Sequence, residues 1–164
     1  MALNTTDTPA TTASVFLCAS CRDHYESEDA GPGLCPICNP AEQARDQMLR
    51  VMIAEQNDAF RRALGFAALW RGQHLKGRTV ATPGFLAIPE RTQAALMNAV
   101  ITFTDWTEDN DPYEDHSFGR VEAHGVAIFW KIDLYDTAYT YGAETPSDPE
   151  GTRRVLTLYL PSEH

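Results

Sequence analysis

Two Cys-x-x-Cys pairs, Cys18/Cys21 and Cys35/Cys38, constrain the fold of this chain more than any other feature of its sequence. Each pair can place two thiolates on one side of a tight turn, and four thiolates form the closed tetrahedral shell of a structural zinc site. A module of this size cannot fold on its apolar content alone, so metal binding would supply most of its folding free energy. The spacing predicts a zinc ribbon over residues 15–39, with a turn at 31–33, that holds one zinc ion.

Other uses of the four cysteines are weaker hypotheses. A redox Cys-x-x-Cys motif is the main alternative, iron in a rubredoxin-like site is another, and His24 could replace one cysteine as a ligand. A four-thiolate shell leaves no open coordination position, so the predicted zinc is structural or serves recognition rather than catalysis. The chain shows neither the features of a signal peptide nor a run of about 18 apolar residues. We therefore expect a protein of the reducing cytoplasm without a membrane span.

The sequence after the cysteine module predicts two amphipathic helices. Apolar residues recur at spacings typical of a helix after Pro40, which follows the candidate N-cap Asn39, and Gly65 is a suitable stop. A second helix is expected at residues 89–103, because a proline suits the first helical position. Between the helices, residues 66–77 suggest a short helical turn and then a loop.

About four β-strands are expected, most of them near the C-terminus. Residues 118–134 predict a β-hairpin that turns at His124-Gly125, and residues 78–82 and 153–161 add two strands. A run of strands at the end of the chain favours an α+β fold, with both helices packed on a mainly antiparallel sheet. A hydrophobic content of 43% over 164 residues is enough for a packed core. The predicted organisation is a flexible tail at 1–14, the zinc ribbon at 15–39 and the α+β domain at 40–164.

The segment Thr104–Gly119 contains six carboxylates and one histidine, with no lysine or arginine. So many acids cannot all be ionised at close range without counter-charge or a metal. One hypothesis is a hard-cation site, whose ligands would be Asp109, Asp111, and Asp115 or His116. A metal-dependent hydrolase or nuclease would add two residues from the hairpin. Its candidate catalytic residues would be Asp109, Asp111, His116, Lys131 and Asp133.

Two non-enzymatic interpretations of this segment are favoured over an enzyme. Asp and Asn side chains stabilise turns by accepting hydrogen bonds from nearby backbone N–H groups, so the segment could be a rigid connector in which His116 is also hydrogen-bonded. Acids that point outward could instead contact an arginine-rich surface of a partner protein complex. The candidate partner-binding residues are Glu108, Asp109, Asp111, Glu114 and Asp115.

A basic belt without any Asp or Glu runs from Ala59 to Pro89. Its cations are Arg61, Arg62, Arg71, Lys76 and Arg78. They could face the acidic segment and hold it through arginine–carboxylate pairs. They could instead contact nucleic acid together with the zinc ribbon, but a net charge of −10 does not favour this alternative.

The chain from about Ala54 to Tyr159 resembles a family of small bacterial proteins known only as a domain of unknown function. The resemblance rests on QNDAFRR (56–62), TEDNDPYEDHSFG (107–119), FWKIDLYD (129–136) and RVLTLYL (154–160). The four-cysteine module is an addition found only in some members. The resemblance implies no activity. Its members are common on plasmids and other mobile elements, which implies a role in conflict with host defence or in maintenance of the element.

These observations predict a non-enzymatic, zinc-containing binding protein encoded by a mobile element. Its acidic surface would inhibit or modulate a host-defence or nucleic-acid-processing complex, which is an association drawn from the family rather than a mechanism. A metal-dependent hydrolase that uses the acidic segment is the first alternative. A nucleic-acid-associated regulator that uses the zinc ribbon and the basic belt is the second.

Overall fold

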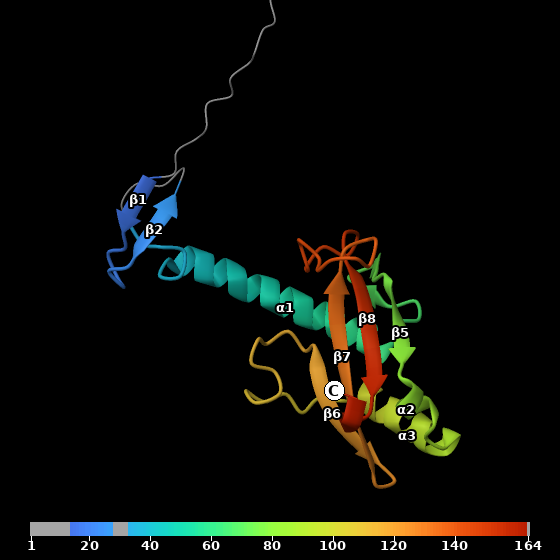
Figure 1. Ribbon diagram of the computed structural model, residues 1–164. Coiled ribbons are helices and arrows are strands. Elements are labelled where there is room, and N and C mark those ends of the chain that lie inside the picture. The colour runs from blue at the N-terminus through green and yellow to red at the C-terminus, as the bar shows by residue number, and fades with distance from the viewer. Residues whose placement is uncertain (1–13, 28–32, 164) are drawn as a thin grey trace, which may run out of the picture. The chain divides into compact units, whose positions relative to one another are not determined.

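The computed structural model describes residues 14–27 and 33–163 (Figure 1). The tail predicted at residues 1–14 and the turn predicted at 31–33 lie almost entirely outside these residues. The chain divides into two compact units, residues 1–47 and 48–164, and each unit is described by itself. None of the helices in the described part of the chain combines the length and the apolarity that crossing a bilayer requires.

The N-terminal unit contains an antiparallel ribbon of two strands, β1 (Ser14–Leu17) and β2 (His24–Ser27). Leu17 pairs with His24, so the first Cys-x-x-Cys pair lies in the connection between the strands. On one side of the ribbon the Phe16 and Tyr25 rings pack with their centroids 5.8 Å apart. The small ribbon predicted around the cysteines is confirmed.

Helix α1 (Pro40–Arg62) is delimited by the local signals that the sequence predicts. Asn39 Oδ1 accepts a hydrogen bond from the Ala41 N–H at 3.0 Å, which satisfies one of the free amides of the first turn. Past the other end, Gly65 has a φ of 75° and donates its N–H to Phe60 O at 2.9 Å. This left-handed glycine prevents the helix from continuing.

The larger unit is built on a four-stranded sheet with the strand order β5–β8–β7–β6. The β6–β7 and β7–β8 pairs are antiparallel, whereas β5 runs parallel to β8. The strands are β5 (Gly77–Ala81), β6 (Phe118–Ala123), β7 (Val126–Tyr135) and β8 (Arg153–Tyr159). The hairpin between β6 and β7 turns at His124 and Gly125, as predicted. Their φ values of 51° and 75° are those of a type I′ turn.

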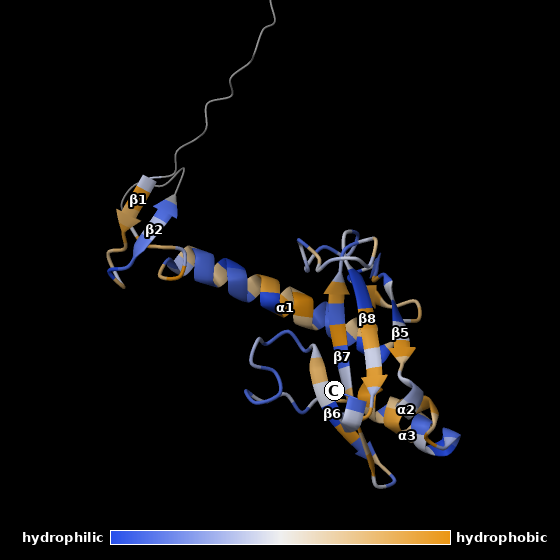
Figure 2. Cartoon of the chain, in the orientation of Figure 1, coloured by the Kyte–Doolittle hydropathy of each residue, from blue (hydrophilic) through white to orange (hydrophobic). Residues whose placement is uncertain are grey.

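One face of this sheet carries the hydrophobic core. Trp130 and Leu158 are cross-strand partners on that face and are 0% and 2% exposed. Phe60 of α1 and Leu96 of α3 (Glu90–Ile101) pack into the same cluster. Figure 1 shows α1 passing behind β7 and β8, and Figure 2 shows polar and apolar residues alternating along these strands. The predicted α+β class, with helices on a mainly antiparallel sheet, is confirmed.

The segment between α1 and β5 differs from the prediction. Residues expected to form a helical turn and a loop form a small antiparallel hairpin of β3 (Leu69–Trp70) and β4 (Gln73–His74). The two residues of its turn, Arg71 and Gly72, have φ values of 49° and 80°, which again indicates a type I′ turn. Arg-Gly is not among the dipeptides that usually signal this turn, so the hairpin was not predicted.

A further helical turn, α2 (Pro83–Leu86), lies next to the C-terminal 3-10 turn η1 (Pro161–Glu163). The Glu163 carboxylate accepts hydrogen bonds from Thr82 Oγ1 at 2.6 Å and from the Gly84 N–H at 3.0 Å. These bonds, the one from Thr82 being the strongest, lower the pKa of Glu163. These bonds hold η1 against the start of α2.

A buried arginine, Arg61, connects α1 with the C-terminus of α3. Its side chain is 0% exposed and donates hydrogen bonds to the carbonyl oxygens of Ile101 at 3.0 Å and Phe103 at 3.1 Å, and also to that of Val100. Ile101 and Phe103 lie at the end of α3 and just past it, where carbonyl groups lack partners within the helix. Burial lowers the pKa of Arg61, and the ion pair with Asp58 Oδ1, at 2.7 Å, opposes this effect.

We expect Arg61→Met to destabilise the larger unit by about 3–5 kcal/mol, because it removes the buried cation that donates to Asp58 Oδ1 and to three carbonyls. Arg62→Met is the matched control. Arg62 pairs with the same Asp58 carboxylate at 2.9 Å but is 58% exposed, so its loss should cost about 1 kcal/mol or less. Urea unfolding measures both changes, and equal losses would contradict the role assigned to Arg61.

Candidate functional site

The four cysteines of the N-terminal unit form a compact cluster. Their Sγ atoms all lie within 4.8 Å of one another, and Cys21 Sγ is 3.8 Å from Cys35 Sγ. Four sulfurs bound to one zinc at about 2.3 Å stand about 3.8 Å apart, so this donor set fits a tetrahedral ion. None of the four is in a disulfide. His24, the candidate replacement ligand, is not part of the group.

Backbone N–H groups in the two cysteine turns stabilise the thiolate form. The Cys35 N–H donates to Cys18 Sγ at 3.3 Å, and this hydrogen bond is the largest reason why the pKa of Cys18 falls to about 6. Burial has the opposite effect on Cys35 and raises the pKa of its thiol. Arg22 closes the first turn with a φ of 66°, and the Cys38 N–H donates to Cys35 O at 2.9 Å in the second. The cluster is therefore a group of four thiols that could hold a metal ion.

The acidic segment forms a loop between α3 and β6, and Asp111 fixes its second half. Asp111 Oδ1 accepts hydrogen bonds from the N–H groups of Asp115 at 3.1 Å and His116 at 3.0 Å. The residue is only 9% exposed, and burial raises the pKa of its carboxyl. A carboxylate this buried cannot be a principal contact for a partner. Asp111 instead acts as the turn-forming acid that one of the sequence hypotheses describes.

Asn110 fixes the first half of the loop in a similar way. Its Oδ1 accepts the Thr107 N–H at 3.0 Å, and its Nδ2 donates to Asp105 O at 2.7 Å. Near the end of the loop, Asp115 Oδ1 accepts the Ser117 N–H at 3.1 Å. The loop is thus held by its own polar side chains at several points along its length.

His116 connects the loop to the rest of the larger unit. Its ring stacks on Trp106 with centroids 3.9 Å apart and an interplanar angle of 7°. Its Nδ1 lies 3.4 Å from Asp58 Oδ1 on α1, and its Nε2 lies 3.7 Å from Asp111 Oδ2. Trp106 in turn packs edge-on against Trp130 of β7, at 5.9 Å. The start and the end of the loop are therefore joined on the core side of the sheet.

Three of the five acids predicted to bind a partner are exposed at the surface of the loop. Glu108, Asp109 and Glu114 are exposed, whereas Asp115 is half-buried. Tyr113 lies among them and is 71% exposed. Together with Asp109 and Asp115 it lines a hollow of ≈ 280 Å³ beside the loop. In Figure 2 the loop is a largely hydrophilic segment.

Four of the five residues of the hydrolase hypothesis form two separate pairs, and the fifth, Asp109, is exposed on the loop. Asp111 and His116 are neighbours in the loop, and Lys131 Nζ forms an ion pair with Asp133 Oδ2 at 2.9 Å. Trp130 points into the core and contacts the Trp106–His116 stack, so the adjacent Lys131 points to the opposite face of the sheet. Among the described residues, 14–27 and 33–163, the four cysteines are the only group of three or more potential ligands whose atoms lie close enough together to hold a metal ion.

The basic belt does not form the carboxylate pairs with the loop that the sequence suggests. Arg62 pairs with Asp58, Arg71 pairs with Glu55 at 2.9 Å, and Lys76 pairs with Glu150. Arg78 lies over the ring of Tyr139. Arg61 reaches the loop through the Phe103 carbonyl and the Trp106 ring, not through an acid of the loop. Its burial is also incompatible with the nucleic-acid contact predicted for it.

A second buried arginine, Arg154, was missed at the sequence level. It is 0% exposed, and burial lowers its pKa to about 10. Its guanidinium donates to Asn57 Oδ1 at 3.1 Å and to Gln56 Oε1, and Asn57 Nδ2 donates to Asp115 O at 2.8 Å. This chain of bonds ties the end of the acidic loop to β8. The sequence did contain one signal for a buried polar partner: two polar residues, Gln56 and Asn57, interrupt the apolar stripe of α1.

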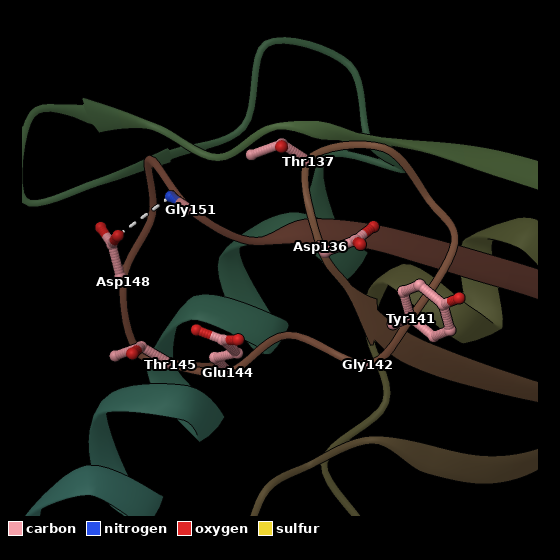
Figure 3. A pocket seen from close by; sticks show the side chains of 8 residues that line it. All are labelled: Asp136, Thr137, Tyr141, Gly142, Glu144, Thr145, Asp148 and Gly151. Carbon is pink, nitrogen blue, oxygen red and sulfur yellow. Dashed lines mark hydrogen bonds between the residues drawn. The ribbon is translucent and has the colours of Figure 1, made fainter. Parts of the chain in front are cut away.

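A hollow of ≈ 450 Å³ lies between the loops that follow β7. Figure 3 shows its acidic side chains lying apart rather than converging on one point. Asp136 Oδ1 accepts the N–H groups of Ala138 and Thr140, and Asp148 Oδ2 accepts that of Gly151 at 3.0 Å. These carboxylates shape their own turns, and the sequence did not single them out.

Comparisons with known proteins bear on the larger unit. No curated protein and no solved structure matches the chain. The family model described as "Protein of unknown function (DUF3768)" matches residues 81–163, from the end of β5 to η1. The match covers half of the chain, includes the acidic loop and the β6–β7 hairpin, and leaves the cysteine cluster as an N-terminal extension. The resemblance seen in the sequence is confirmed, and the chain belongs to this family of proteins of unknown function.

Proposed function

We propose that this chain is a non-enzymatic, zinc-containing binding protein that docks on a protein complex through its acidic loop. The main observation behind the proposal is that the backbone of the acidic loop is fixed while several of its carboxylates stay exposed. Asp111 and the Trp106–His116 stack fix its backbone from within, and Glu108, Asp109 and Glu114 remain exposed. A loop that is already ordered loses little conformational entropy on binding, which favours affinity.

The surface of the loop indicates what the partner would present. Exposed carboxylates favour a surface rich in arginine or lysine, because complementary charges guide and orient the encounter. Tyr113 could supply the aromatic contact that often dominates the binding energy of an interface. The neighbouring hollow of ≈ 280 Å³, lined by Asp109, Tyr113 and Phe118, is a suitable receptor for one basic side chain of the partner.

The partner that we propose is a host-defence or nucleic-acid-processing complex. Such complexes carry basic grooves that bind phosphates, and a fixed row of carboxylates can compete for these grooves. The chain would then act as an inhibitor or modulator encoded by a mobile element. The cysteine cluster would hold one structural zinc ion, since four sulfur ligands leave no open position for a substrate. Its reduced thiols suit a cytoplasmic protein.

Metal content tests the zinc assignment. We expect the purified wild-type protein to contain about one zinc per chain by elemental mass spectrometry. Cys35→Ser should lose most of it, because three thiolates leave the shell incomplete. Ser20→Ala, which lies in the first cysteine turn but removes no ligand, should keep its zinc. Iron in place of zinc, or full zinc content after Cys35→Ser, would contradict the assignment.

Charge reversal tests the acidic loop as a docking surface. Cross-linking and capture from the native host should enrich one defined complex with the wild-type protein. The double variant Glu108→Lys/Asp109→Lys should reduce recovery of that complex at least about tenfold, since it replaces attraction with repulsion at exposed positions. The control Asp46→Lys/Glu144→Lys makes the same change in net charge at exposed residues outside the loop and should leave recovery unchanged. Equal losses in both variants would contradict docking through the loop.

A further inference from the structure

The face of the main sheet opposite the core forms a surface of its own. Cross-strand partners project to the same side. Since Trp130 and Leu158 point into the core, their neighbours Phe129 with Tyr159, and Lys131 with Thr157, point to the other side. In Figure 1 this face is turned toward the viewer, with α1 behind it. It belongs entirely to the larger unit.

Positive charge is concentrated on this face of a strongly acidic chain. Strand register places on it the cations Arg78, Arg120, Lys131 and Arg153 and the acids Glu122 and Asp133. The face therefore carries four of the 13 Lys and Arg residues but two of the 23 Asp and Glu residues. A chain of net charge −10 has here a patch on which cations outnumber acids, which is complementary to a polyanion.

The two acids of the face do not remove this complementarity. Glu122 pairs with Arg120 at 3.0 Å and Asp133 pairs with Lys131 at 2.9 Å, but both cations are about half exposed. Ion pairs at such exposure are weak, so a phosphate can replace the carboxylate at little cost. Successive phosphates of one nucleic-acid strand could therefore bind Arg120 and Lys131.

Three aromatic rings cross the face beside these cations. Phe118 of β6 and Phe129 of β7 are partly exposed, with ring centroids 5.4 Å apart. Tyr159 of β8 is 4% exposed and packs against Phe129 with the ring centroids 5.8 Å apart, so it supports the Phe129 ring. Rings on adjacent strands of an open sheet can each stack on one base of a single strand, whereas a duplex hides its bases.

The same face also offers groups that recognise ribose. Thr157 lies between Lys131 and Val80 in the register, and its hydroxyl can donate to and accept from a 2′-hydroxyl. The Asp133 carboxylate on the next row is an acceptor. Contacts with the 2′-hydroxyl are what distinguish RNA from DNA at a protein surface.

We propose that the face of the β5–β8–β7–β6 sheet opposite the core binds single-stranded RNA, with bases on Phe118 and Phe129 and phosphates on Arg120 and Lys131. The residues differ from the basic belt that the sequence suggested, except for Arg78. The proposal does not rest on the acidic loop: its cations, Arg120 and Lys131, lie on β6 and β7, and Phe118 is the residue that it shares with the hollow beside that loop.

Fluorescence anisotropy with the full-length chain and a labelled RNA of about 12 mixed nucleotides tests the proposal. We expect binding that weakens steeply between about 50 mM and about 200 mM salt, because phosphate contacts release counterions. Lys131→Glu and Phe129→Leu should each weaken binding about tenfold or more. Arg45→Glu, which makes the same charge change at a 69% exposed site on α1, should weaken binding about twofold or less.

Several outcomes would overturn the proposal. One is no binding of RNA by the wild-type protein at about 50 mM salt, and another is an equal effect of Arg45→Glu and Lys131→Glu. Single-stranded DNA of the same sequence that binds as tightly as RNA would contradict the commitment to RNA. Sedimentation of the same samples tests whether a second copy of the chain occupies the face instead. If the wild-type protein binds no RNA but forms a dimer, and Lys131→Glu dissociates that dimer, the face is a dimer interface. Circular dichroism must show that each variant remains folded.

Discussion

The buried guanidinium of Arg61 is the interaction on which the rest of the larger unit depends. The side chain is inaccessible to water, and its Nη1 and Nη2 groups donate within the protein to Asp58 and to the carbonyls at the end of α3. The guanidinium also lies 5.3 Å from the Trp130 ring and 5.5 Å from the Trp106 ring. One cation thereby sets where α3 ends, where the acidic loop begins, and how both pack on β7.

The acidic loop and the cation-rich face of the sheet are two distinct surfaces of the larger unit. The exposed acids of the loop are held in place because His116 and Asn57 tie the loop to the core side of the sheet. The cations of the sheet face project to the other side of the same strands. Two surfaces of opposite sign on one small unit could be occupied at the same time. A protein partner at the loop and RNA at the sheet would use different charged residues, and Phe118, which lines the hollow beside the loop, is the residue that both would approach.

The sequence predicted elements that local chemistry specifies. The cap at Asn39, the stop at Gly65 and the alternation along β7 each correspond to the observed structure, as does the grouping of four cysteines. The sequence could not predict which charges would be buried. Arg61 and Arg62 are adjacent and chemically identical, yet one lies in the core and the other is at the surface. Arg61 lies on the side of α1 that faces the core, where the carbonyls at the end of α3 accept its hydrogen bonds, and Arg62 lies on the side that faces solvent. A local sequence pattern does not encode the position of those distant carbonyls.

Hydrogen exchange at single-amide resolution tests most directly whether the acidic loop is held as a fixed surface. The amides of Asp115 and His116, bonded to Asp111, and that of Asp111, bonded to Thr107 O at 2.8 Å, should exchange far more slowly than in an unfolded chain. The same amides should lose that protection in Asp111→Ala while the strands keep theirs. Exchange of these amides at the unfolded rate in the wild-type protein would contradict a preorganised docking loop.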